Sequence, residues 1–196
     1  MTAMALDDRG RGAVRTLAVC LGLGLVVGVR WQIFRTDALD GVFEGAIFGL
    51  ALLAVAFLGG LRPSEPPLGA VAVGLAVGAV LVAVSILARW PVPPLVLGHA
   101  APFLPWVAVT SLVATSEELV MRGTLWRWAQ ATGGDVAALL ATSLLFSLMH
   151  VPVYGPAVIP LDFGVGLVFG GLRLWFGGAA APAAAHVLAD LATWWL

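Results

Sequence analysis

Apolar stretches long enough to cross a membrane follow one another along almost the whole of this 196-residue chain. Hydrophobic residues make up 61% of the sequence and charged residues 11%, whereas soluble domains average about 45–50% and about 25%. A soluble core of this size cannot bury so much apolar surface, so lipid must cover much of it. At about 20 residues per spanning helix there is room for roughly six to eight spans. We therefore expect an all-α, polytopic membrane helix bundle of about seven transmembrane helices.

Short polar or proline-containing breaks separate the apolar stretches. The segments 62–67 and 90–94 cannot continue a helix because of their prolines. The diglycine at 133–134 indicates a helix end, and so does Val151-Pro152, because a residue before proline avoids the helical region. The expected helices are 13–30, 43–61, 68–89, 103–130, 136–150, 156–174 and 180–196. We interpret the first as a retained helix, since no signal-cleavage pattern follows it.

Glycines spaced by four residues, which let helices approach closely in lipid, form the pairs Gly24/Gly28, Gly45/Gly49, Gly74/Gly78 and Gly166/Gly170. With 24 glycines in the chain, chance alone also produces such spacings.

Arginine placement predicts the orientation of the chain in the membrane. With the N-terminus inside, the inner segments hold Arg9, Arg11, Arg15, Arg62, Arg122, Arg127 and Arg173, and the outer segments hold Arg30, Arg35 and Arg89. This excess of inner arginines favours an N-terminus on the inner side.

Charge and cysteine content exclude other classes. The net charge of −1 gives no indication of a nucleic-acid partner. The single cysteine allows neither an internal disulfide nor a cysteine metal cluster.

The candidate chemistry lies in ionisable residues inside apolar helices, which are costly in hydrocarbon and indicate function by default. The first half of the chain has almost none. The second half has three clusters, one in each of three expected helices: Glu117, Glu118 and Arg122; His150; and His186 with Asp190.

Spacing suggests that these clusters face a common interior. Glu118 and Arg122, Phe146 and His150, and His186 and Asp190 are each four residues apart, so each pair shares a helix face. Glu117 and His150 each lie about 20 Å along their helices from the break that joins them. The hydrocarbon core is about 30 Å thick, so they should meet at a similar depth inside the membrane.

Two histidines and a carboxylate at one depth suit a site that activates water. A glutamate sheltered from bulk water is a usable general base, and histidines can donate hydrogen bonds to a developing oxyanion. Alternatively, Glu117, His150 and His186 form a set that could bind a divalent metal, zinc, with an open fourth position. The residues leave the choice between one such metal and none open.

The three ordered motifs, Glu117-Glu118-x-x-x-Arg122, Phe146-x-x-x-His150 and His186-x-x-x-Asp190, resemble the CPBP or Abi family, which includes the type II CAAX prenyl endopeptidases and bacteriocin-processing enzymes. The glycine-rich stretch 163–171 resembles it too. The resemblance covers about residues 103–196, which we expect to be the catalytic helices of a single membrane domain spanning residues 1–196.

The resemblance implies an intramembrane endopeptidase, with a metalloendopeptidase as one form. By carry-over, Glu117 would activate the water, and His150 would bind or polarise the water or the carbonyl. Glu118 and Arg122 would position Glu117 and hold the helix. His186 and Asp190 would form the oxyanion site. The family often has Asn where this chain has Asp190. An ionised Asp cannot donate to an oxyanion, so it must be protonated, orient His186 or touch a metal.

Phe146 is expected to pack around His150 rather than to take part in the chemistry. The implied partners are the lipid bilayer and a peptide or protein substrate, either a bacteriocin precursor or a prenylated CAAX protein. Short loops and the use of Arg for every basic residue favour a bacterial cytoplasmic membrane.

Two other functions use the same residues. A non-proteolytic membrane scaffold or bacteriocin-immunity protein would keep the fold without the reaction. A proton-coupled transporter would use the same groups as a relay, although a relay has no need of two adjacent glutamates.

Overall fold

A computed structural model of the chain describes residues 3–36, 41–61, 67–88 and 102–196, with side chains from Val14 onward. These segments are helical, with short turns and without a strand, which confirms the expected all-α fold. In chain order the elements are α1 (Ala3–Thr36), α2 (Gly41–Leu58), α3 (Leu68–Leu87), α4 (Phe103–Glu118), the π-helix η1 (Leu119–Leu125), α5 (Trp126–Tyr154), the 3-10 helix η2 (Pro156–Val158), α6 (Ile159–Phe176) and α7 (Ala180–Ala192).

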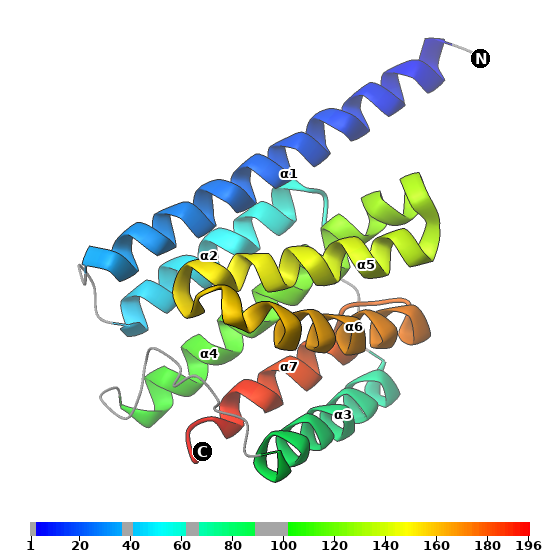
Figure 1. Ribbon diagram of the computed structural model, residues 1–196. Coiled ribbons are helices and arrows are strands. Elements are labelled where there is room, and N and C mark those ends of the chain that lie inside the picture. Colours follow the sequence, from blue (N-terminus) through cyan, green and yellow to red (C-terminus); the bar gives the residue numbers. More distant parts are fainter. Residues whose placement is uncertain (1–2, 37–40, 62–66, 89–101) are drawn as a thin grey trace.

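Five of the described segments are long and apolar enough to cross a membrane: 14–36, 41–58, 68–87, 103–154 and 156–176. The segment 103–154 turns back on itself at Gly134, whose φ of 76° interrupts the helix, so it supplies two crossings (Figure 1). The shorter apolar helix α7 completes a bundle of the expected size. Many apolar side chains point outward, among them Leu68 at 88% and Leu87 at 83% exposure, as lipid-facing residues must.

The helices that carry the motifs lie in the interior of the bundle (Figure 1). α4 packs between α2 and α7, while α1 covers α2 and α3 covers α7 on opposite sides. α5 and α6 pack on each other, and α6 also contacts α7. Residues from α4 to α7 that are far apart in sequence therefore meet in the middle of the molecule.

Three of the four glycine pairs lie where helices cross most closely. A Cβ added at Gly45 would lie 2.6 Å from Val109 of α4, one at Gly78 2.7 Å from the Ala185 carbonyl of α7, and one at Gly166 2.9 Å from Ser143 of α5. Gly24 and Gly28 have nothing within 4 Å, so the fourth pair is no packing motif in this bundle.

Several expected helix ends are wrong. α1 begins at Ala3 and not at residue 13, and it continues past Arg30 to Thr36, with Arg30 lying against Glu44 of α2. α7 ends at Ala192 and not at residue 196. α5 continues through Val151-Pro152 to Tyr154. A proline this close to the end of a helix removes few backbone bonds, and the helix ends at Gly155, whose φ is 79°.

Candidate active site

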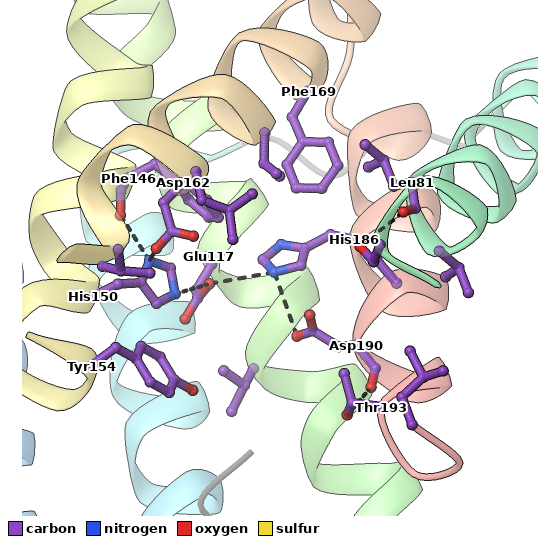
Figure 2. Close-up of a pocket in the computed structure, with 18 of the residues that line it drawn as sticks. Leu81, Glu117, Phe146, His150, Tyr154, Asp162, Phe169, His186, Asp190 and Thr193 are labelled. Atoms are coloured by element: carbon purple, nitrogen blue, oxygen red, sulfur yellow. Dashed lines mark hydrogen bonds and ion pairs between the residues drawn. The ribbon is translucent and has the colours of Figure 1, made fainter. Parts of the chain in front are cut away.

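A cavity of about 250 Å³ lies between α1, α3, α4, α5, α6 and α7. Most of its lining is aliphatic or aromatic. Its polar lining includes Glu117, His150, Tyr154, Asp162, His186 and Asp190, which Figure 2 shows around one space. The cavity therefore gathers polar groups from four elements inside an apolar bundle.

Glu117 of α4 is at the centre of this group and is 2% exposed. Its Oε2 lies 3.8 Å from His150 Nε2 and 3.8 Å from His186 Nε2 (Figure 2). These distances are too long for direct hydrogen bonds and too short for a water between the atoms, but a water in the cavity beside them could contact the carboxylate and both imidazoles. The structure thus brings together the carboxylate and both imidazoles that the sequence analysis singled out.

Glu118 points away from the cavity and into the protein. Its Oε1 accepts a hydrogen bond of 3.0 Å from Arg122 Nη1 and lies 3.2 Å from His186 Nδ1. Both members of the Glu118–Arg122 ion pair are fully buried. Arg122 also donates from Nη2 to the Gly166 carbonyl of α6 at 2.9 Å. The pair therefore joins α4, α6 and α7 directly behind the two site residues Glu117 and His186.

Arg122 lies in the π-helix η1, which starts immediately after Glu118. Such wide turns leave helix carbonyls without their usual partners and are frequent at functional sites. Here Arg173 Nε donates to the Arg122 carbonyl at 2.8 Å. Counting Arg122 among the inner surface segments is therefore wrong, since it is fully buried and paired with Glu118.

His150 is held in one orientation by its own helix. Its Nδ1 lies 2.8 Å from the Phe146 carbonyl, and because a carbonyl only accepts, we assign the proton to Nδ1. Asp162 Oδ2 is 3.3 Å from the same nitrogen but receives no hydrogen bond, since that proton is directed to Phe146. The Nε2 of His150 is left facing Glu117.

Phe146 packs against both histidines and against the buried arginine of the ion pair. Its ring centroid lies 4.8 Å from the His150 ring and 5.4 Å from the His186 ring, both edge to face. The Arg122 guanidinium lies 4.9 Å from the same ring. Phe146 thus packs against both imidazoles, which agrees with the support role expected for it.

Asp190 lies one helical turn after His186 on α7, at the open side of the cavity. Its Oδ2 is 3.5 Å from His186 Nε2 (Figure 2). Carboxylates thus face both ring nitrogens of His186, Glu118 at Nδ1 and Asp190 at Nε2.

Sequence analysis missed several polar residues of the site. Arg30 was assigned to an outer segment, yet it lines the cavity and pairs with Glu44 of α2 at 3.0 Å. Asp162 and Tyr154 also line the cavity, and the Tyr154 ring stacks on His150 at 5.9 Å. The signal for Arg30 and Glu44 was present, because both are charged residues next to or within apolar stretches.

Glu117, His150 and His186 are the side chains that would hold a divalent metal ion in this cavity. Among the segments that the structure describes, no three His, Cys, Asp or Glu side chains are already grouped as metal ligands. The Nδ1 atoms of His150 and His186 are directed to Phe146 and Glu118, the arrangement that is usual for metal-binding histidines. Each Nε2 lies 3.8 Å from Glu117 Oε2, a few tenths of an ångström more than the spacing of about 3.3–3.4 Å between neighbouring ligands of a tetrahedral zinc. A metal held there would polarise the water or the substrate carbonyl.

The fold and the site define a multi-pass membrane protein with a carboxylate and two imidazoles around a water-sized space in its interior. Residues 99–192 match the family described as type II CAAX prenyl endopeptidase Rce1-like. This part of the chain is therefore similar to the Rce1-like domain, which supports the predicted CPBP or CAAX protease-like family. The match includes all three motifs. No curated protein and no solved structure matches the chain.

Proposed function

We propose that the protein is an intramembrane endopeptidase that hydrolyses a peptide bond with a water activated by Glu117. One observation carries the proposal: a carboxylate oxygen lies 3.8 Å from each of two imidazole nitrogens, and all three line one mostly apolar cavity. A single water in the cavity beside these atoms would touch a general base and two positioning groups at once. Surrounding apolar residues keep bulk water away and strengthen these interactions.

In the proposed reaction, Glu117 takes a proton from the water, and the oxygen attacks the carbonyl carbon of the substrate. The resulting tetrahedral intermediate carries a negative oxygen. Its collapse breaks the C–N bond, and Glu117 returns its proton to the leaving amine. His150 Nε2, whose partner nitrogen is occupied by Phe146, accepts the second hydrogen of the water and so orients it.

In this scheme His186 is doubly protonated, with Nδ1–H donating to Glu118 and Nε2–H donating to the developing oxyanion. Glu118 is itself held by Arg122. Asp190 lies beside Nε2, where it orients the ring, so we assign it an orienting role and not direct contact with the oxyanion. A general base contributes about 10²–10⁴-fold to a rate, and one oxyanion donor about 10²–10³-fold.

The test compares membranes that contain wild-type protein with membranes that contain Glu117→Gln, by identifying new peptide ends by mass spectrometry. Asp135→Asn is the matched control, because this exposed carboxylate bonds only with Gln130 outside the cavity. The expected result is a set of cleavage products made by wild type and Asp135→Asn and missing with Glu117→Gln. Products that persist with Glu117→Gln contradict the proposal.

The same comparison separates the other candidate functions. A scaffold or immunity protein keeps its function in Glu117→Gln, and a proton-coupled transporter yields a flux that depends on a pH gradient without new peptide ends. For the substrate we propose a peptide or bacteriocin precursor in a bacterial cytoplasmic membrane, with a prenylated CAAX protein as the other candidate.

A further inference from the structure

A second cavity, of about 220 Å³, lies between α1, the end of α2, η1 and the start of α5, and it shares no lining residue with the cavity around Glu117. Arg15, Arg127 and Trp128 form its exposed part. Its buried part includes Val19 and Leu125, which are 2% and 3% exposed. The described lining contains no acidic residue. The cavity thus combines two cations with an apolar floor, and the mechanism above does not use it.

This second cavity lies at one end of the bundle, where α1 begins, α2 ends and the chain turns back at Gly134 (Figure 1). The apolar span 14–36 begins one residue before Arg15. Arg127 and Trp128 precede the turn at Gly134 by about 10 Å along the helix. The cavity is therefore at the level of the lipid headgroups, where arginine and tryptophan side chains concentrate.

The lining of this cavity is tied together by hydrogen bonds to the end of α2. Arg127 donates from Nη2 to the Gly60 carbonyl at 3.1 Å, and Thr124 of η1 donates from Oγ1 to the Ala56 carbonyl at 3.3 Å. A guanidinium has five N–H donors, so an arginine that binds one carbonyl can still bind an anion. Arg15 comes to the same cavity from α1. Two guanidinium groups at one cavity repel each other, and an anion between them removes that repulsion.

We infer that this cavity binds the phosphate of an anionic phospholipid headgroup, in the leaflet at the N-terminal end of the bundle. The inference does not rest on the proposed function. Arginines bind phosphate oxygens through paired hydrogen bonds, and basic pockets between membrane helices bind anionic headgroups.

Two features favour an anionic lipid over other phosphates. A lipid has glycerol and acyl carbons that can lie against Val19, Leu125 and Trp128, which a free phosphate lacks. A choline or ethanolamine headgroup would bring a further cation beside Arg15 and Arg127, so the site favours a headgroup without one.

The test measures the melting temperature of purified full-length protein in nanodiscs of phosphatidylcholine, with and without a fraction of phosphatidylglycerol. A ligand that binds only the folded protein stabilises it, so wild type should melt about 2–4 °C higher with phosphatidylglycerol. Phosphatidylethanolamine in place of phosphatidylglycerol should give no such rise. Inorganic phosphate added to the phosphatidylcholine nanodiscs should give none either.

The informative variants are Arg15→Gln and Arg127→Gln, each of which should lose at least half of the rise that phosphatidylglycerol gives. Each variant is compared with itself in the two lipids, so an effect of the substitution on stability alone cancels. Arg35→Gln is the matched control, since Arg35 lies at the other end of α1 against Trp31 and lines neither cavity. It should keep the full rise.

The inference is overturned if wild type shows no rise, or if both arginine variants keep it, since phosphatidylglycerol then acts through the bilayer as a whole. An equal rise with phosphatidylethanolamine means that the headgroup charge is not recognised, and an equal rise with inorganic phosphate means that the occupant is a soluble anion. Either result overturns the assignment to an anionic lipid.

A phosphatidylglycerol analogue with a photoreactive headgroup decides the matter even if neither variant folds. In wild-type protein it should label the residues that line this cavity in preference to the opposite end of the bundle. Equal labelling at the two ends overturns the inference.

Discussion

Glu117 and Glu118 are adjacent in sequence and have different surroundings in the folded protein. Glu117 faces the cavity and is flanked by two imidazoles. Glu118 is turned into the protein, where it binds Arg122 and His186. Successive residues of a helix point about 100° apart, so one helix can present one carboxylate to the substrate and the other to its own support.

The Glu118–Arg122 pair should be required for stability as a pair. Because both side chains are fully buried, removing one partner leaves a buried charge alone, which costs about 3–5 kcal/mol. We expect Glu118→Gln and Arg122→Met each to lower stability by about this amount, and the double variant to lose less than either one. Thermal unfolding in detergent measures this. A loss of stability in the double variant equal to the sum of the two single losses would show that the two charges do not stabilise each other.

Phe146 should affect the rate more than the fold. It touches both imidazoles and the Arg122 guanidinium, and small displacements of catalytic groups cost up to about 10²-fold. Phe146→Leu should therefore lower kcat by about 10- to 100-fold with little change in KM. Phe57→Leu, at a lipid-facing position 51% exposed, is the control. An unchanged kcat for Phe146→Leu would mean that the ring does not position the histidines.

At the scale of elements, the small residues of α3 decide how closely α3 approaches α7, the helix that carries His186 and Asp190. A Cβ at Gly78 would lie 2.7 Å from the Ala185 carbonyl oxygen and 3.1 Å from Leu188 Cβ. Backbone atoms cannot move aside as a flexible side chain does, so a methyl group at this position has to displace one of the two helices.

Gly78→Ala should consequently destabilise the protein by about 1–3 kcal/mol, as overpacking does, and reduce activity by moving α7. Gly24→Ala is the matched control, because its Cβ would meet nothing within 4 Å. Alanine favours a helix over glycine by up to about 1 kcal/mol, so the control should be neutral or stabilising. Thermal unfolding of both variants decides. Equal melting temperatures would contradict the close packing of α3 and α7.

At the scale of the whole molecule, the arginine count that predicted an inner N-terminus needs revision. Arg122 is fully buried and Arg30 lines the cavity, so neither reports on a membrane surface. Without these two the count changes from seven against three to six against two. The predicted orientation is unchanged, with the turn at Gly134 on the same side as the N-terminus and the C-terminus opposite.

This orientation can be tested with single cysteines. In a Cys20→Ser background, which removes the chain's one native cysteine, Leu196→Cys should react in intact cells with a maleimide that does not cross membranes. Asp135→Cys should react only after the membrane is opened. The reverse labelling pattern would place the N-terminus outside and show that the bundle has the opposite orientation in the membrane.

The amino-acid sequence alone determined the class of protein and most of the site. An apolar composition requires a helical membrane bundle, since lipid cannot satisfy backbone groups left open, and this depends on no particular packing. Ionisable groups in apolar helices are costly wherever they lie, so Glu117, His150, His186 and Asp190 stood out before any fold was known. The family match then confirmed the resemblance that their spacing carried.

Only the tertiary structure decided which of these groups face one another. Arg30 and Glu44 come from different helices, and Asp162 lies in the first turn of α6. Their places in or behind the cavity depend on contacts between elements. The same holds for which of the two glutamates, Glu117 or Glu118, faces the cavity. The rotation of α4 about its axis relative to α7 determines this. The free-energy cost of placing an ionisable side chain in lipid depends on that residue alone, so the sequence reveals it. The distance between two side chains across the cavity depends on how the helices pack, so only the tertiary structure reveals it.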